Sequence, residues 1–196
     1  MSKTREQLEA WLKTIKIPAE THVVDVGGSQ KPVRPRLGEA GENSLYNILD
    51  LPKPHEVAVK PYLTMDLNED WEGDPEEFDE DAGVVFCLEV MEYVWNPYQA
   101  LKNLNWLLQS GGKLYLSVPF VYPVHNPKEN DYLRYTDMGI SRLLEKAGFK
   151  IDEIIPRNAD SANTLLDAFY EMEGMKPSRS YRGHNSVGWL IEATKI

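Results

Sequence analysis

The sequence has only one cysteine, Cys87, among its 196 residues. A single thiol cannot form an internal disulfide or a thiolate zinc site, which excludes the disulfide frameworks of small secreted proteins. The chain also lacks an Asn-x-Ser/Thr glycosylation acceptor, and residues 1–10 are charged and amphipathic rather than apolar as in a signal peptide. These absences favour a cytoplasmic location, and we expect no metal site.

Long apolar runs and an excess of positive charge are missing as well. The longest apolar run, residues 82–88, has the length of a strand and is far shorter than the roughly 20 residues of a membrane-spanning helix. The chain has 31 Asp+Glu against 21 Lys+Arg, and ten of the acids lie in residues 66–81 with no base among them. We expect no membrane partner, and this charge disfavours nucleic-acid binding. The acidic stretch is typical of a solvated loop; the alternative is a surface that repels anions or meets a basic partner.

Two common nucleotide-binding motifs are also absent. The sequence contains neither the dinucleotide fingerprint G-x-G-x-x-G nor the phosphate loop G-x-x-x-x-G-K-[ST]. NAD, FAD and ATP are therefore poor candidate ligands. In contrast, 42% apolar and 10% aromatic residues suffice for a folded core, and the length suits a single domain over residues 1–196.

The apolar pattern predicts an α/β protein. We expect strands at 21–26, 44–49, 62–65, 83–88, 113–118, 149–155 and 187–193, and helices at 5–15, 96–111, 136–148 and 161–172. Residues 29–41 should be a loop, and the N-terminal helix within residues 1–17 should pack on an edge of the sheet. Most strands are apolar throughout and alternate with helices, which indicates a Rossmann-like, doubly wound, mainly parallel sheet with helices on both faces.

Glycine and acidic residues follow several of the predicted strands, at the carboxyl ends where ligands bind in such sheets. Gly27 and Gly28 follow the first strand, so the backbone there can approach a ligand closely. Asp50 lies 23 residues after Gly27, a separation that suits a carboxylate accepting from both ribose hydroxyls. Asp66 could accept from an adenine amino group, while the next main-chain amide meets a ring nitrogen. Together these residues predict an adenosine site, although each alone is also typical of an ordinary turn or cap.

Several segments resemble one known family. They are VVDVGG at 23–28, FDEDAGVVFCLEVMEYV at 78–94, ALKNLNWLLQSGGKLYLSVPF at 100–120 and RYTDMGISRLLEKAGF at 134–149. With Asp50 and Asp66, they resemble the class I S-adenosylmethionine-dependent methyltransferases, most closely the group called type 11, over residues 23–155. The resemblance implies a seven-stranded sheet whose last strand is antiparallel.

The same resemblance implies how S-adenosyl-L-methionine would bind. It places the glycine turn beneath the methionine part, Asp50 at the ribose, Asp66 at the adenine, and the end of the fourth strand near the amino group and sulfonium. The implied cofactor-binding residues are Asp25, Gly27, Gly28, Ser29, Asp50, Asp66, Leu67, Leu88 and Glu89. The chain departs from the family pattern at Ser29 and Lys31, where glycines are usual, and at Tyr93, where a histidine is common.

The segment 119–135 is the candidate acceptor side, because it begins at the end of the fifth predicted strand. Its candidate substrate-binding residues are Tyr122, Asp131, Tyr132, Arg134 and Tyr135. His125 is the candidate catalytic base, since histidine commonly changes charge near neutral pH; alternatively it anchors the loop. Asp131 and Arg134 could equally form an ion pair within the loop.

We therefore expect methyl transfer from S-adenosylmethionine to a small-molecule or saccharide-like acceptor at oxygen or nitrogen. Ser29, Lys31 and Tyr93 motivate one alternative, a catalytically inactive cofactor-binding or structural protein with the same fold. A second alternative is a methyltransferase that acts on nucleic acid or protein, which the charge disfavours.

Overall fold

The computed structural model describes residues 2–42, 44–71, 82–157, 160–175 and 186–196. Its strands are β1 (His22–Val26), β2 (Leu45–Asp50), β3 (Leu63–Thr64), β4 (Ala82–Leu88), β5 (Leu108–Pro119), β6 (Phe149–Arg157) and β7 (Gly188–Lys195). Its helices are α1 (Lys3–Leu12), α2 (Glu39–Glu42), α3 (Pro97–Leu107), α4 (Asp137–Lys146) and α5 (Asp160–Met172), with short 3-10 turns η1 (Arg34–Arg36), η2 (Met91–Tyr93) and η3 (Lys128–Asn130). Most of the acidic stretch, residues 72–81, lies outside the described residues.

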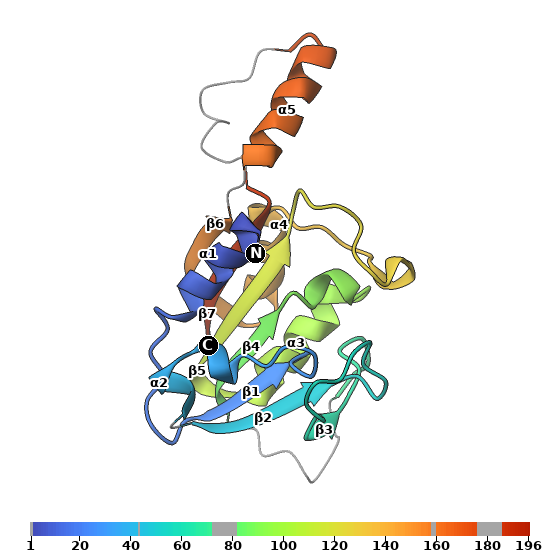
Figure 1. The fold of residues 1–196 in the computed structure, drawn as a ribbon. Coiled ribbons are helices and arrows are strands. Elements are labelled where there is room, and N and C mark those ends of the chain that lie inside the picture. The colour runs from blue at the N-terminus through green and yellow to red at the C-terminus, as the bar shows by residue number, and fades with distance from the viewer. Residues whose placement is uncertain (1, 43, 72–81, 158–159, 176–185) are drawn as a thin grey trace.

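The strands form one seven-stranded sheet in the order β3-β2-β1-β4-β5-β7-β6 (Figure 1). Strands β1 to β5 pair in parallel, and β7 runs antiparallel between β5 and β6. The chain winds outward from β1 to β3 and then returns to place β4 beside β1. The predicted doubly wound sheet with an antiparallel last strand is confirmed, and its topological switch point lies between β1 and β4.

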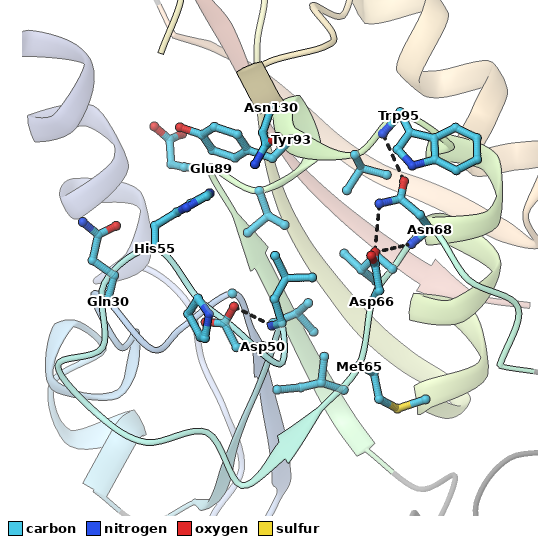
Figure 2. A pocket seen from close by; sticks show the side chains of 18 of the residues that line it. Gln30, Asp50, His55, Met65, Asp66, Asn68, Glu89, Tyr93, Trp95 and Asn130 are labelled. Atoms are coloured by element: carbon cyan, nitrogen blue, oxygen red, sulfur yellow. Dashed lines mark hydrogen bonds between the residues drawn. The ribbon is translucent and has the colours of Figure 1, made fainter. Parts of the chain in front are cut away.

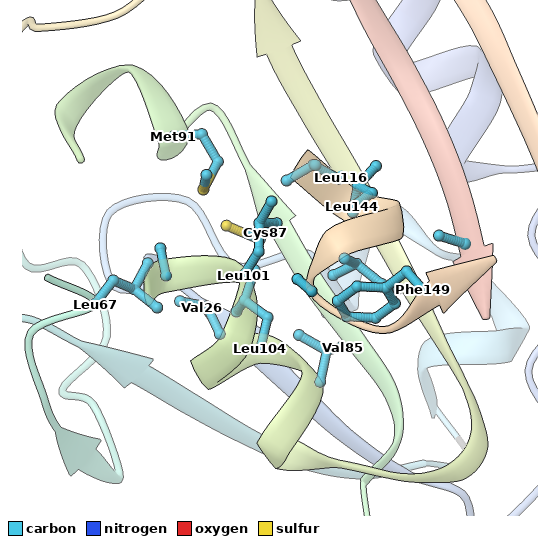
Figure 3. Close-up of a cluster of buried hydrophobic side chains, with 14 of the residues drawn as sticks. Val26, Leu67, Val85, Cys87, Met91, Leu101, Leu104, Leu116, Leu144 and Phe149 are labelled. Atoms are coloured by element: carbon cyan, nitrogen blue, oxygen red, sulfur yellow. The ribbon is translucent and has the colours of Figure 1, made fainter. Parts of the chain in front are cut away.

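One face of the sheet is covered by α3 and α4. Leu101 and Leu104 of α3 and Leu144 of α4 are fully buried against strand side chains such as Val85 and Leu116 (Figure 3). Helix α4 begins where the sequence predicts, because the Thr136 hydroxyl accepts a hydrogen bond from the Gly139 amide. Burial of these leucines holds the carboxyl end of β4 in a fixed position.

Helix α1 lies on the opposite face, and it also meets the edge strand β6, where Arg157 Nη2 donates to the Thr4 carbonyl at 3.0 Å. Leu8 and Leu12 are fully buried against the middle of the sheet. Glu9 on the same helix pairs with Arg36 at 3.0 Å, Lys31 at 3.5 Å and Arg5 at 3.0 Å. Burial alone would raise the pKa of Glu9, but these cations outweigh it and lower the pKa. The basic residues after the glycine turn thus anchor α1.

Two predicted boundaries are wrong for tertiary reasons. Helix α3 ends at Leu107 instead of residue 111, because Leu108 is fully buried and pairs with Ala82 of β4. The predicted loop 29–41 contains η1 and the start of α2, which are joined by a hydrogen bond from Arg34 Nε to the Gly41 carbonyl at 3.0 Å. Among the described helices, none has the length and apolar character to cross a bilayer.

Candidate functional site

A cavity of about 300 Å³ lies at the carboxyl ends of β1, β2, β3 and β4, beside the topological switch point (Figure 2). Its size is at the lower end of the range for small-molecule sites. The polar and aromatic residues that line it are Gln30, Asp50, His55, Glu56, Asp66, Asn68, Glu89, Tyr93, Trp95, Asn130 and Tyr132. Of the predicted cofactor residues, Gly27, Asp50, Asp66, Leu67 and Glu89 line this cavity.

In the turn after β1, neighbouring side chains leave no room for a Cβ on either glycine. Gly27 has a φ of 75°, and a Cβ there would lie 2.4 Å from Val90. A Cβ on Gly28 would lie 2.4 Å from an Asp25 carboxylate oxygen. Asp25 is buried and accepts hydrogen bonds from the Val33 amide at 2.7 Å and from a tyrosine hydroxyl on β2. Burial raises the pKa of Asp25 to about 6.

Three predicted cofactor residues therefore support the turn instead of lining the cavity. Asp25 and Gly28 pack against each other behind it, and Ser29 is fully buried. The Ser29 amide donates to Asp50 Oδ2 at 3.0 Å, which fixes the carboxylate at the end of β2. Leu88 is also outside the lining, because its side chain packs with the α1 face of the sheet.

Asp50 and Asp66 present their carboxylates at neighbouring strand ends. Asp50 Oδ1 accepts from the Leu51 amide at 2.8 Å, so each of its oxygens has one partner and further lone pairs. Asp66 Oδ1 accepts from the main-chain and side-chain nitrogens of Asn68 at 2.9 and 2.8 Å. The Leu67 amide has no acceptor in the described part of the chain. This carboxylate beside a free amide is the pair of groups that an adenine edge requires.

Glu89 follows β4 with a φ of 59°, a left-handed conformation that costs energy for a residue with a side chain. Its carboxylate accepts from the Ser117 hydroxyl at 2.9 Å and pairs with Arg157 at 2.5 Å. Burial alone would raise the pKa of Glu89, but Arg157 and Ser117 outweigh it and keep the pKa low. The structure therefore holds an ionised carboxylate at the cavity wall, on a residue whose backbone is strained.

Segment 51–62, between β2 and β3, borders the cavity and contains none of the predicted site residues. The Ala58 and Val59 amides both donate to the Ser29 carbonyl at 2.9 Å. Gln30 Nε2 donates to Glu56 Oε2 at 2.7 Å. These bonds draw the segment over the glycine turn and put His55 in the lining, opposite Tyr93 (Figure 2). The available signal was its position between two strands whose ends were both expected at the site.

Most side chains of the predicted acceptor segment 119–135 do not line the cavity. Arg134 is occupied by Asp131 and by the carbonyls of Tyr122, Pro123 and Leu133. Tyr135 is buried, and its hydroxyl donates to the Met91 carbonyl at 2.8 Å. Of the predicted substrate residues, Tyr122, Asp131, Arg134 and Tyr135 lie outside the lining, and Tyr132 lines it.

His125 also lies outside this cavity, contrary to the expected placement. Its ring stacks on Tyr93 with a centroid distance of 6.2 Å and meets Tyr122 edge-on. It borders a much smaller second cavity together with Glu89, Glu92 and Arg157. Glu92 is 3% exposed, and its Oε1 is 3.9 Å from His125 Nδ1. Burial, followed by the charge of Glu89, raises the pKa of Glu92 to about 8.

Among the described lysine, arginine, aspartate and glutamate residues, only acidic ones line the cavity of about 300 Å³ at the strand ends. Asp50, Glu56, Asp66 and Glu89 line it, and no lysine or arginine of the described residues does. Such a surface repels phosphate groups and attracts a cationic ligand. No group of three or more His, Cys, Asp or Glu side chains in the described ranges could hold a metal ion.

Comparison with known proteins places the fold. No protein-family model and no curated protein sequence matches the chain. An S-adenosylmethionine dependent methyltransferase from Mesorhizobium loti is similar, with 14% identity, a TM-score of 0.58 and 98% coverage of both chains. Phosphoethanolamine N-methyltransferase 2 of Haemonchus contortus, solved with S-adenosyl-L-methionine, has 15% identity and a TM-score of 0.58 over 97% of this chain and 52% of its own.

The same fold occurs in the cyclase SpnF, which has 12% identity and a TM-score of 0.60 over 97% of this chain and 80% of its own. At these sequence identities the comparison shows only that the folds are similar. With its strand order and its antiparallel β7, the chain has the fold of the class I S-adenosylmethionine-dependent methyltransferases.

Proposed function

We propose that the chain binds S-adenosyl-L-methionine in the larger cavity and transfers its methyl group to a small-molecule acceptor. The observation that carries this proposal is the arrangement of three groups at neighbouring strand ends. Asp50 has free lone pairs for ribose hydroxyls, Asp66 has an acceptor for an amino group, and the Leu67 amide lacks a partner among the described residues.

The sign of the charge in the cavity also supports this cofactor. The bound cofactor would supply an activated methyl group on a positively charged sulfur. The four carboxylates of the lining suit such a cation, whereas a nucleotide with phosphates would meet no compensating side chain in the described lining. The protein then needs chiefly to hold the acceptor in line with the methyl carbon.

A small acceptor, saccharide-like compounds included, suits the enclosed site. Segment 51–62 covers one side of the cavity, and Tyr93 with Tyr132 borders another. Transfer to oxygen or nitrogen fits the polar lining.

The cofactor proposal is tested by calorimetric titration with S-adenosylhomocysteine. Asp50→Asn should weaken binding about 10- to 100-fold, because hydrogen bonds to a charged group contribute about 1.5–3 kcal/mol. Asp152→Asn is the matched control, since Asp152 pairs with Lys113 on another part of the sheet. Equal affinity of the two variants, or no binding by the wild type, would contradict the proposal.

Methyl transfer itself is tested with a metabolite extract and methyl-labelled S-adenosylmethionine. We expect label in at least one small molecule whose mass rises by one CH2 group. Cofactor binding without any labelled product in extracts from several sources would instead support a catalytically inactive protein.

A further inference from the structure

His55 is the described histidine that the fold places in the cavity. It lies on segment 51–62, which is tied to the glycine turn through the Ser29 carbonyl and through Gln30. Its ring meets the Tyr93 ring edge-on at a centroid distance of 6.0 Å, across the part of the cavity that Glu89 also lines (Figure 2). The imidazole nitrogens make no hydrogen bond to any described residue. They are therefore free to bind a ligand.

His125, in contrast, is engaged on the far side of Tyr93. The Tyr93 hydroxyl has one hydrogen, which it donates to the Asn126 carbonyl at 3.0 Å. His125 Nδ1, 2.8 Å from the same hydroxyl, must then donate to its oxygen. The His125 main-chain amide is bound to Asp131. These contacts make His125 a support for Tyr93.

The charge around His55 limits the acceptor. Glu56 is its chain neighbour and Glu89 lies on the same cavity, whereas no described Lys or Arg lines that cavity. On segment 119–135, Arg134 is bound to Asp131 and to main-chain carbonyls, and neither Arg134 nor Lys128 lines the cavity. A phosphate or carboxylate on the acceptor would find no lysine or arginine in the described lining of the cavity, because Lys53 and Lys60 of segment 51–62 lie outside it.

We propose that His55, rather than His125, takes the proton from the acceptor, and that this acceptor carries no phosphate or carboxylate group. The proposal rests on the proposed methyl transfer. A lone pair on the acceptor nitrogen or oxygen forms the bond to the methyl carbon, the carbon–sulfur bond breaks, and its electron pair stays on sulfur. The proton released by the acceptor goes to the free lone pair of the His55 imidazole.

The position of His55 can be tested without turnover. Diethyl pyrocarbonate modifies accessible imidazoles, and peptide mass spectrometry reports each site separately. Saturating S-adenosylhomocysteine should slow modification of His55 at least fivefold and that of His125 less than twofold. Failure of S-adenosylhomocysteine to bind would overturn the proposed function, whereas normal binding without protection of His55 would overturn this inference alone.

The acceptor class can be tested on the same metabolite extract. The extract is passed over an anion-exchange resin at neutral pH, and both fractions are incubated with protein and labelled S-adenosylmethionine. We expect labelled products from the unretained fraction. Labelling confined to the retained, anionic fraction would overturn the inference while leaving methyl transfer intact.

The role of His55 is tested with two matched variants, His55→Gln and His125→Gln, on the unretained fraction. His55→Gln should lower the rate about 100-fold or more and abolish the fall in rate at acidic pH, as expected for loss of a base. Its affinity for S-adenosylhomocysteine should change less than threefold. His125→Gln should retain the wild-type shape of the pH profile. The reverse pattern, or equal losses in both variants, would refute the assignment.

Discussion

Glu92 should make the stability of this protein fall as the pH rises, and Glu92→Gln should remove that effect. Glu92 is almost fully buried, and its Oε2 has no partner in the described structure. The groups that face it are Glu89, Asp131, Arg134 and His125. Burial contributes most, and the pKa of Glu92 rises from 4.5 to about 8.

The sign follows from proton binding. Between pH 4.5 and 8 the folded protein keeps a proton on Glu92 that the unfolded chain has released, so raising the pH favours unfolding. The slope is at most about 1.4 kcal/mol per pH unit. With a folded pKa of about 8, the loss between pH 6 and 8 is about 2 kcal/mol. For a chain of this size that corresponds to a fall in Tm of roughly 4–8 °C.

Urea denaturation at pH 6, 7 and 8 measures this loss. Between pH 6 and 8 the free energy of unfolding of Glu92→Gln should fall by about 2 kcal/mol less than that of the wild type. The contribution of Asp25 to the pH dependence is the same in both proteins and cancels in the comparison. Glu145→Gln, an exposed glutamate on α4, should keep the wild-type dependence. Parallel curves for wild type and Glu92→Gln would refute the assignment of a neutral, buried carboxyl group.

Two further substitutions test the packing that positions the site. Gly28→Ala should destabilise the protein by about 1–3 kcal/mol, because its Cβ would overlap the Asp25 carboxylate; thermal denaturation should show the loss, and an unchanged Tm would contradict the crowding. Leu104→Ala should cost about 2–5 kcal/mol of unfolding free energy in urea, since Leu104 is fully buried between α3 and the sheet; a cost below about 1 kcal/mol would contradict that packing.

The sheet and the residues at the ends of β1, β2, β3 and β4 that line the cavity were predictable because their signals are local. Short apolar strands ending in Gly27, Asp50, Asp66 and Glu89 place these residues at one edge once the sheet is parallel, and the structure confirms that all four line one cavity. The roles of Asp25 and Gly28 were not predictable, since their mutual contact depends on how the turn folds back.

The sequence did not predict which segment borders the rest of the cavity, because two segments leave strand ends at the same edge. Segments 51–62 and 119–135 both leave strand ends at the cavity, and the sequence does not show which one bends over it. The decision lies in contacts between distant residues, such as those of the Ser29 carbonyl with two amides of segment 51–62. The ion pair between Asp131 and Arg134 instead links two residues within segment 119–135. His125 was favoured because segment 119–135 begins at the end of the fifth predicted strand.

The uniformly acidic wall has a consequence for the catalytic cycle under the proposed function. Methyl donation converts a positively charged sulfur into a neutral thioether, so the cofactor loses one positive charge and with it part of its electrostatic attraction to the carboxylates of the cavity. Spent cofactor should consequently dissociate more readily than fresh donor, and raising the salt concentration should narrow that difference.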